Sequence, residues 1–465
     1  MSKGIRVGFV IGSFFIAILL MVIFINLLTP AFLRARPAKA SNGWRADRSL
    51  ERTNLITDTG DLFLPIIMNG AGLQTYTVTV LIQGGEQDEI DFEAAVESFE
   101  AQSSINVVFE ALPNIENEIF DRLESSNPPD ASIVVQPSLL DELVAAGYTI
   151  DLNQWFNQAY LQGQYDQFWL DLSDYEGELS GVWYRINPKS IVYYPLPEFT
   201  DAGYQVPQTW TEMLTLTQQI AASGTTPWCV GIESGGATGW VGTDWVEDIM
   251  LRTTSTISYD QWVDGALLFN SPEVRNAFET MAEIWFNDDY VYGGRSQIPN
   301  IHFGDAPLPM FDDPPGCFLH RQGTFIPLFF PEGTQYGVDY DYFYLPPIDA
   351  QYGTPVLVAG DQFAAFADRY EVKEFLRYLT TGESVKYFIQ NQTWVSPHED
   401  TPLNWYPQEN KGYAEIIANA STFRFDGSDL MPSEVGAGTF WQGITDYVNG
   451  TDLDTVLNTI DASWP

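Results

Sequence analysis

The sequence predicts an α/β fold with two α/β regions that follow a single N-terminal membrane-spanning helix. Three observations carry this prediction. Residues 7–28 form an uncharged apolar run, residues 75–148 alternate between strand and helix patterns, and a second α/β-rich region begins near residue 190. The length of 465 residues also favours two or three domains or lobes over one.

The apolar run is long enough to cross a bilayer. A helix over 7–28 extends roughly 33 Å at about 1.5 Å per residue, and the run exceeds the roughly 7–15 apolar residues of a secretory signal. A small-residue pattern at 38–40 lies well past the run and behind two arginines, which argues against cleavage there. We predict an uncleaved signal anchor over 7–28 and a stalk or linker over 29–74. Basic residues on both sides leave the orientation open from charge alone.

The first α/β region is a regular alternation. Strand patterns cover 75–83, 105–112 and 131–137, and helix patterns cover 90–103, 115–125 and 138–148, with Ser138 as the expected N-cap of the last helix. The order βαβαβα predicts a parallel sheet with ligands bound at the carboxyl ends of its strands. Glu86 and Gln136 follow two of those ends.

The second α/β region is longer and less regular. Its helix patterns are 209–223, with Thr209 as N-cap, then 274–287 and 372–392, with a break at Gly382, and its strand patterns are 343–349 and 354–367, broken by turns. The region therefore contains enough predicted strands for a second sheet, together with predicted helices.

Charge excludes one class of partner. The net charge is −41, and the first 52 residues hold eight Lys/Arg and two acids, which leaves 13 basic and 60 acidic residues on the rest. A body this acidic repels a phosphate backbone, so no nucleic-acid partner is expected. It also argues against anionic ligands attracted from a distance.

The chain has two cysteines, Cys229 and Cys317, and three histidines, with no C-x-x-C pair and no Cys/His cluster. We therefore expect no metal site and no cofactor. The residues alone leave two alternatives open, one disulfide in an exported protein or two buried free thiols.

Several fragments occur in a recognisable order. They are PPDASIVVQPSLLDELVAAGYTIDL (128–152), GELSGVWYRINPKSIVYYP (177–195), VPQTWTEML (206–214) and the segment that begins TPVLVAGDQFAAFA (354–402). This order resembles the extracellular solute-binding proteins that serve ABC sugar importers, the maltose-binding-protein-like family. In that resemblance, 177–195 is the crossover hinge strand.

A narrower resemblance lies in TTPWCVGIESGGATGWVGTDWVEDIMLRT (225–253) and PMFDDPPGCFLHRQGTF (309–325), which look like the alpha-glucoside-binding subgroup. In that subgroup two cysteines occupy these same segments. The resemblance therefore implies a Cys229–Cys317 disulfide.

The family resemblance implies a two-lobed periplasmic-binding-protein-like fold (type II) with a hinge. The expected lobes are 75–185 with 355–402, and 186–354 with 403–465. It further implies a receptor and no enzyme: an extracytoplasmic body that closes on an oligosaccharide or disaccharide, an alpha-glucoside by the subgroup, and then docks on the permease membrane subunits. The alternatives are a receptor of the same fold for a polyol or peptide and, less favoured, a carbohydrate-active hydrolase.

Sugar recognition needs aromatic rings against C–H faces and polar groups against hydroxyls. The glycine-rich stretch before Trp240 favours an exposed ring there, whereas Trp245 and Trp394 are equally explained by packing, and packing is the favoured role of Tyr184. Asp361 follows a strand and is also explained by an Asx turn. The complete set of expected ligand-binding residues is Glu86, Gln136, Tyr184, Trp240, Asp244, Trp245, Arg321, Phe325, Asp361 and Trp394.

Overall fold

The computed structural model describes residues 76–465. The anchor expected over 7–28 and the stalk expected over 29–74 lie outside these residues. Between 76 and 465, no helix combines the length and the apolar character needed to cross a membrane.

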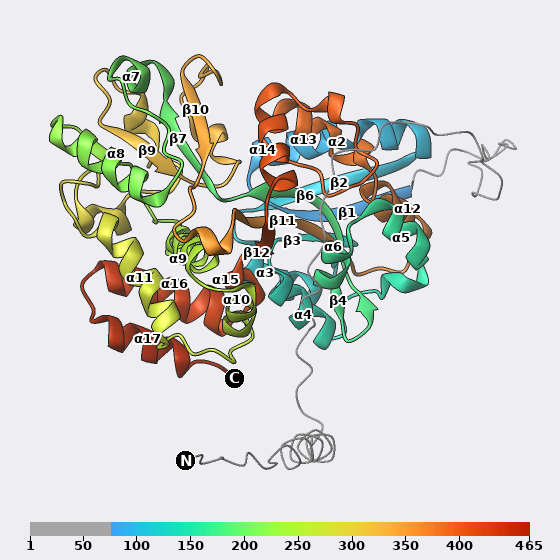
Figure 1. The fold of residues 1–465 in the computed structure, drawn as a ribbon. Coiled ribbons are helices and arrows are strands. Elements are labelled where there is room, and N and C mark those ends of the chain that lie inside the picture. The colour runs from blue at the N-terminus through green and yellow to red at the C-terminus, as the bar shows by residue number, and fades with distance from the viewer. Residues whose placement is uncertain (1–75) are drawn as a thin grey trace, which may run out of the picture. The chain divides into compact units, whose positions relative to one another are not determined.

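The first sheet has six strands (Figure 1). Its order is β12 (Thr422–Phe425), β11 (Pro355–Ala365), β3 (Ala131–Val134), β1 (Tyr76–Gln83) and β2 (Ile105–Leu112), and β6 (Val182–Pro188) also pairs with β11. The strand β1 is parallel to both β2 and β3, which confirms the predicted parallel core. The long strand β11 runs antiparallel to β3 and β6.

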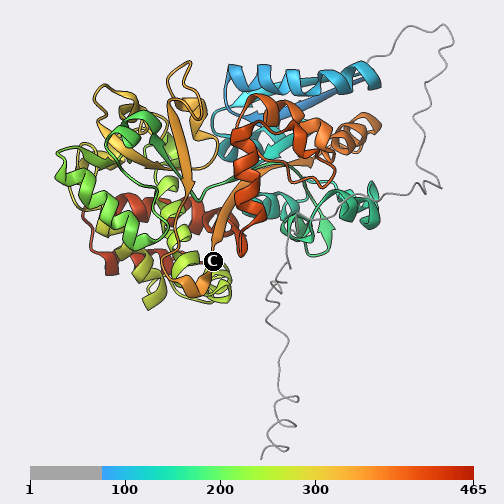
Figure 2. The same ribbon diagram turned by 45° about the horizontal axis from the view of Figure 1, so that its top comes forward.

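The second sheet has four strands, in the order β10 (Tyr340–Tyr344), β7 (Ile191–Pro195), β9 (Cys317–Arg321) and β8 (Thr226–Trp228). Figures 1 and 2 show the two sheets as separate groups, each with its own helices. The helices grouped with the first sheet in Figure 1 are α2 (Glu86–Ser103), α3 (Ile115–Leu123), α4 (Pro137–Ala145), α5 (Gln158–Gln164), α6 (Gln167–Leu172), α12 (Tyr370–Leu379), α13 (Gly382–Asn391) and α14 (Gln408–Ala418). The remaining helices are α7 (Leu196–Asp201), α8 (Trp210–Ala222), α9 (Trp240–Thr253), α10 (Thr256–Val263), α11 (Pro272–Trp285), α15 (Gly427–Leu430), α16 (Trp441–Val448) and α17 (Leu453–Asp461).

The chain passes between the two sheets three times. It crosses at Lys189–Ser190 between β6 and β7, again between β10 and β11, and a third time after β12. The first crossing lies within 177–195, the segment expected to be the hinge strand. The main chain braces it, because Lys189 N–H donates to Leu357 O and Leu345 N–H donates to Ser190 O.

Two details of the crossings differ from expectation. The short strand β12 pairs in parallel with β11 and so lies in the first sheet, whereas the sequence assigned residues 403–465 to the second lobe. The pattern over 354–367 is one strand, β11, whose pairing with β6 shifts register between Asp361 and Gln362. Glycine at 360 fits against the Arg185 carbonyl, where a Cβ would lie 2.6 Å from that oxygen.

Helix ends follow local chemistry. The Thr209 hydroxyl accepts the Glu212 N–H at 3.2 Å, which confirms the predicted N-cap. A break before Gly382 separates α12 from α13, also as predicted. The N-cap of α4 is Gln136 instead of Ser138, because Pro137 fits the first helical position, where its fixed φ is favourable and no N–H is needed.

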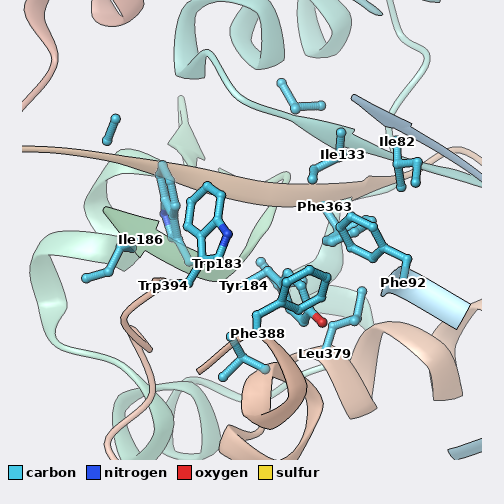
Figure 3. Packing of buried hydrophobic residues seen from close by; sticks show 14 of the residues in the cluster. Ile82, Phe92, Ile133, Trp183, Tyr184, Ile186, Phe363, Leu379, Phe388 and Trp394 are labelled. Carbon is cyan, nitrogen blue, oxygen red and sulfur yellow. The ribbon is translucent and has the colours of Figure 1, made fainter. Parts of the chain in front are cut away.

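The hydrophobic interior forms two clusters. The first surrounds the first sheet and extends to second-sheet residues such as Tyr193 and Tyr340, and the second covers most of the remaining second-sheet side. In the first cluster, the Tyr184 ring packs against Phe363 and Phe388, with ring centres 5.4 and 5.9 Å apart (Figure 3). The Trp183 indole N–H donates to Trp169 O, so this large buried ring is also satisfied as a donor. These contacts fix the strand β6 that leads into the first crossing.

A disulfide joins Cys229 to Cys317, with the Cα atoms 5.6 Å apart. It confirms the pairing that the resemblance implied and excludes the alternative of two free thiols. The bond ties the start of β9 to the residue that follows β8, within the second sheet.

Candidate functional site

The glycine-rich stretch 235–239 ends at Gly239, the N-cap of α9. Gly239 has a φ of 117°, and a Cβ there would lie 2.2 Å from the Trp441 carbonyl oxygen, so only glycine fits. Trp240 is the next residue and begins the helix. Its half-buried ring contacts Phe303 and Phe325, with ring centres 5.2 and 6.0 Å away.

A lysine covers this tryptophan. The Lys189 ammonium, from the first crossing, lies 5.2 Å from the centre of the Trp240 ring. The same nitrogen is 2.8 Å from Asp244 Oδ1 and 2.5 Å from Asp426 Oδ2. Lys189 therefore joins α9 to the third crossing. We name Lys189, Trp240, Asp244, Arg321, Phe325 and Asp426 the hinge cluster.

The charges of the hinge cluster belong to a buried alternating row. Beyond Lys189, Asp244 faces Arg321, Arg321 Nη2 lies 2.7 Å from Asp248 Oδ2, and Asp248 also pairs with Arg252. The full row is Asp426, Lys189, Asp244, Arg321, Asp248 and Arg252, with side chains at most 7% exposed. Each buried charge has an opposite neighbour, which is the condition for such charges to persist away from water.

Burial changes the protonation of this row. Burial, with the neighbouring Asp426 carboxylate, raises the pKa of Asp244 to about 7, although Lys189 and Arg321 act in the opposite direction. Burial lowers the pKa of Lys189, but Asp244 and Asp426 raise it by more, so the ammonium stays protonated.

A third carboxylate adjoins the row. Glu247 accepts the Gly427 and Ser428 N–H groups at 2.9 and 3.0 Å. Oxygens of Asp244, Glu247 and Asp426 lie within 4.8 Å of one another, a spacing that suits a cation. The Lys189 ammonium already supplies positive charge to two of the three.

A second cluster lies on the first sheet. Arg185 of β6 pairs with Asp361 of β11, with 2.5 Å between Nε and Oδ2. The guanidinium carbon of Arg185 is also 4.0 Å from the centre of the Trp394 ring. We name these three residues the first-sheet cluster. In both clusters a cation from the strand or crossing at 182–190 covers a tryptophan.

The structure groups the sequence-predicted residues unevenly. Trp240, Asp244, Arg321 and Phe325 come together in the hinge cluster, and Asp361 and Trp394 come together around Arg185. Gln136 Nε2 donates to Asp429 Oδ1 at 3.3 Å, which links α4 to α15, next to Asp426. Glu86 is exposed at the first residue of α2.

Two predicted site residues are core residues instead. The Tyr184 side chain is fully buried, and its hydroxyl donates to Ser384 O at 2.8 Å. Trp245 is 2% exposed and packs between Trp228 and Trp285, with ring centres 5.3 and 5.7 Å away. We therefore leave both residues out of the candidate site.

Two surface hollows lie elsewhere. One, of about 830 Å³, is lined by polar residues that include Asp166, Glu399 and Asp400. The other, of about 430 Å³, lies between β10 and α14 beside Tyr342 and Tyr344. Neither is lined by a sequence-predicted ligand residue, and the two clusters remain the better candidates on their chemistry.

Related proteins share this architecture. Among solved structures, the bacterial solute receptor AcbH superposes with a TM-score of 0.73 at 18% identity, covering 84% of this chain and 97% of that one. Maltose-bound MalE3 of T. maritima has a TM-score of 0.63 at 15% identity, covering 83% and 98%. At these identities the likeness establishes the fold, which is the expected two-lobed α/β fold.

Sequence relatives are closer. The osmoprotective compounds-binding protein GgtB of Synechocystis sp. is 44% identical over 390 residues, 83% of this chain and 92% of that protein. The alpha-glucosides-binding periplasmic protein AglE of Rhizobium meliloti is 38% identical over 411 residues, 85% and 88% of the two chains.

The family profile described as bacterial extracellular solute-binding protein matches residues 94–404. The protein is accordingly a substrate-binding receptor of an ABC importer, with an extracytoplasmic body, and is not an enzyme. On the strength of this match and the two relatives, the chain belongs to the bacterial extracellular solute-binding protein family.

Proposed function

We propose that the chain binds an alpha-glucoside, a disaccharide or short oligosaccharide, between its two lobes and delivers it to a permease. The observation that carries the proposal is the half-buried Trp240 ring, held with Phe303 and Phe325 beside a buried row of charges. An aromatic face next to polar side chains suits the alternating C–H faces and hydroxyl edges of a pyranose.

The two sequence relatives support different ligands. AglE is named for alpha-glucosides and GgtB for osmoprotective compounds. The second candidate is therefore an osmoprotective solute such as a polyol. The charge of the site supports either ligand over an anion, since Lys189 and Arg321 are already paired with carboxylates.

The proposed mechanism is closure about the three crossings. Ligand favours the closed form by its greater affinity for that form, and the closed form docks on the permease. Because Lys189 and Asp426 belong to two different crossings, their ion pair is placed to couple hinge geometry to the aromatic face of Trp240.

We further propose that residues 7–28 anchor the receptor in the cell membrane and that 29–74 form its stalk. The uncharged run over 7–28 supports the proposal. An anchored receptor stays near its permease, which raises its effective concentration there.

Thermal unfolding of the full-length chain in detergent, with a panel of sugars, polyols and peptides, tests the ligand class. A ligand at about one hundred times its dissociation constant stabilises the fold by about 2.7 kcal/mol. We expect stabilisation by maltose, trehalose or sucrose. Stabilisation by sorbitol or glycerol, with none by these disaccharides, would favour the osmoprotective solute. Stabilisation by peptides alone would overturn both candidates.

A further inference from the structure

Unpaired polar atoms concentrate in one part of the interior. Within the described chain, twelve buried side-chain nitrogen or oxygen atoms have no hydrogen-bond partner. Seven of the twelve belong to Asn187, Asp244 and the segment His320–Thr324. Since native proteins pair the great majority of buried polar groups, this concentration requires an explanation.

Two of the seven atoms have an electrostatic partner. Arg321 Nη1 and Asp244 Oδ2 face each other at 3.4 Å in the charged row. Four others carry no charge: Asn187 Oδ1, His320 Nε2, Gln322 Nε2 and Thr324 Oγ1. Their residues are at most 5% exposed. We name Asn187, Gln322 and Thr324 the polar shelf.

The polar shelf lies where the two lobes meet. Thr324 N–H donates to Pro188 O, and Gln322 N–H donates to Ile191 O, both at 3.1 Å, so the turn after β9 rests against the first crossing. Between them, a Cβ on Gly323 would lie 2.8 Å from Asn187 Oδ1. Glycine at position 323 therefore leaves room for the Asn187 side-chain amide, on β6, to approach the turn that follows β9 of the second sheet.

The polar shelf adjoins the aromatic face. The same Cβ on Gly323 would lie 2.8 Å from the Phe325 ring, and the Phe325 and Trp240 ring centres are 6.0 Å apart. The unpaired amide oxygen of Asn187 thus lies beside the Phe325 ring at the lobe junction, and Gln322 and Thr324 flank Gly323 in the same turn.

The chemistry of the shelf defines a ligand class. Asn187 Oδ1 accepts a hydrogen bond, Gln322 Nε2 donates one, and the Thr324 hydroxyl does either. All three groups are neutral. A hydroxyl both donates and accepts, so a ligand with several hydroxyls satisfies this set, whereas a phosphate or carboxylate offers acceptors only.

We propose that the polar shelf recognises hydroxyls of a neutral polyhydroxylated ligand whose apolar face lies on Trp240 and Phe325. This inference rests on the proposed function and deepens it, because it names Asn187, Gln322 and Thr324 as determinants of specificity. The shelf atoms are enclosed in this conformation, so the ligand reaches them when the lobes separate.

The proposal predicts opposite effects on stability and binding. An unpaired buried hydroxyl or amide destabilises the ligand-free protein, and replacing it with an apolar group of the same shape is neutral or stabilising. Thr324→Val and Asn187→Leu should therefore leave the unfolding temperature unchanged or higher. The same substitutions remove a partner of the ligand and should weaken disaccharide affinity roughly tenfold.

Thr217→Val is the matched control. Thr217 is fully buried, and its hydroxyl accepts the Trp228 Nε1–H at 3.0 Å, so this hydroxyl has a partner within the protein. Its loss should lower the unfolding temperature and leave affinity unchanged. The contrast separates a ligand-directed hydroxyl from a structural one.

The experiment is calorimetric titration of the full-length wild type and the three variants with maltose, trehalose, sucrose, sorbitol and glucose 6-phosphate, together with thermal unfolding without ligand. The expected result is weaker disaccharide or polyol binding by Thr324→Val and Asn187→Leu with undiminished unfolding temperature. If the wild type binds a disaccharide and the affinities of Thr324→Val and Asn187→Leu are within twofold of the wild-type affinity, the proposed role of the polar shelf is wrong and the proposed function is retained. Preferred binding of glucose 6-phosphate overturns the shelf as well. A wild type that binds none of the probes overturns the proposed function.

Discussion

The Lys189 ammonium lies 2.8 Å from Asp244 Oδ1 while it covers the Trp240 ring at 5.2 Å from the ring centre. One cation therefore serves the buried charged row and the aromatic face at once. Because Lys189 also pairs with Asp426, its removal affects the hinge, the charged row and the candidate site together.

Lys189→Met should strongly destabilise the fold. The substitution leaves Asp244 and Asp426 buried without their shared cation, and breaking a buried pair in this way costs about 3–5 kcal/mol. Urea unfolding of the full-length chain measures the loss. Lys386→Met is the control, since the Lys386–Glu383 pair is 34% and 46% exposed and should contribute less than about 1 kcal/mol. Equal small losses in both variants would contradict a central role of Lys189.

The sequence held a signal for Lys189 that composition alone does not reveal. Arg185, Asn187 and Lys189 alternate with apolar residues inside the strand-like segment VWYRINPKSIVYYP. A period of two places alternate residues of a strand on one face. All three side chains take part in the clusters or the shelf, yet none was among the predicted site residues.

The predictable parts of the fold are those with strong local periodicity. The strands β1 to β3 and their helices could be predicted from the sequence because the apolar residues that each element buries lie close together along the chain. The strand β12 was missed because it has four residues and its place beside β11 depends on a partner more than sixty positions away. Trp245 has the packing role that was its alternative explanation, since an aromatic residue gives the same local pattern in a core as in a binding site. Tyr184 has the packing role that the sequence favoured.

Trp240→Ala should weaken sugar binding about tenfold or more, because the half-buried ring supplies the proposed aromatic face. Calorimetric titration with the disaccharide that binds the wild type measures the effect. Trp245→Phe is the comparison, because Trp245 packs between two other tryptophans and should affect stability but not affinity. Unchanged affinity in Trp240→Ala would remove the ring from the proposed site.

Reduction of the Cys229–Cys317 disulfide should lower the free energy of unfolding by about 2–5 kcal/mol, because the bond closes a long loop and limits the unfolded chain. The sequence separation of the two cysteines is 88 residues. Urea unfolding with and without reductant, at one pH, measures the difference. The double variant Cys229→Ser/Cys317→Ser, insensitive to reductant, is the control. An identical midpoint for oxidised and reduced wild type would contradict the prediction.

Acid should destabilise the protein through its buried histidines. Burial lowers the pKa of His398 to about 3, although main-chain hydrogen bonds oppose it, and lowers the pKa of His320 to about 4. An unfolded histidine has a pKa near 6.5. Below about pH 6.5 these two histidines therefore bind protons in the unfolded chain while they stay neutral in the native protein. This stabilisation is present above about pH 6.5 and is lost as the pH falls toward about 4 for His320 and about 3 for His398. The contribution of Asp244 to stability increases as the pH falls over the same range, because its raised pKa favours proton uptake by the native state.

A difference measurement isolates the histidine contribution. In His398→Gln the unfolding free energy should fall less between pH 7 and pH 5 than it does in wild type, because one titrating group is gone. His398 contacts Tyr165 and Ser396 in the interior, so the variant is compared with itself at the two pH values and not with the absolute stability of wild type. His302→Gln, at a half-buried position, controls for the loss of an imidazole. An equal pH dependence in His398→Gln and wild type would mean that His398 has the same pKa in the native and unfolded states, against the burial of its ring.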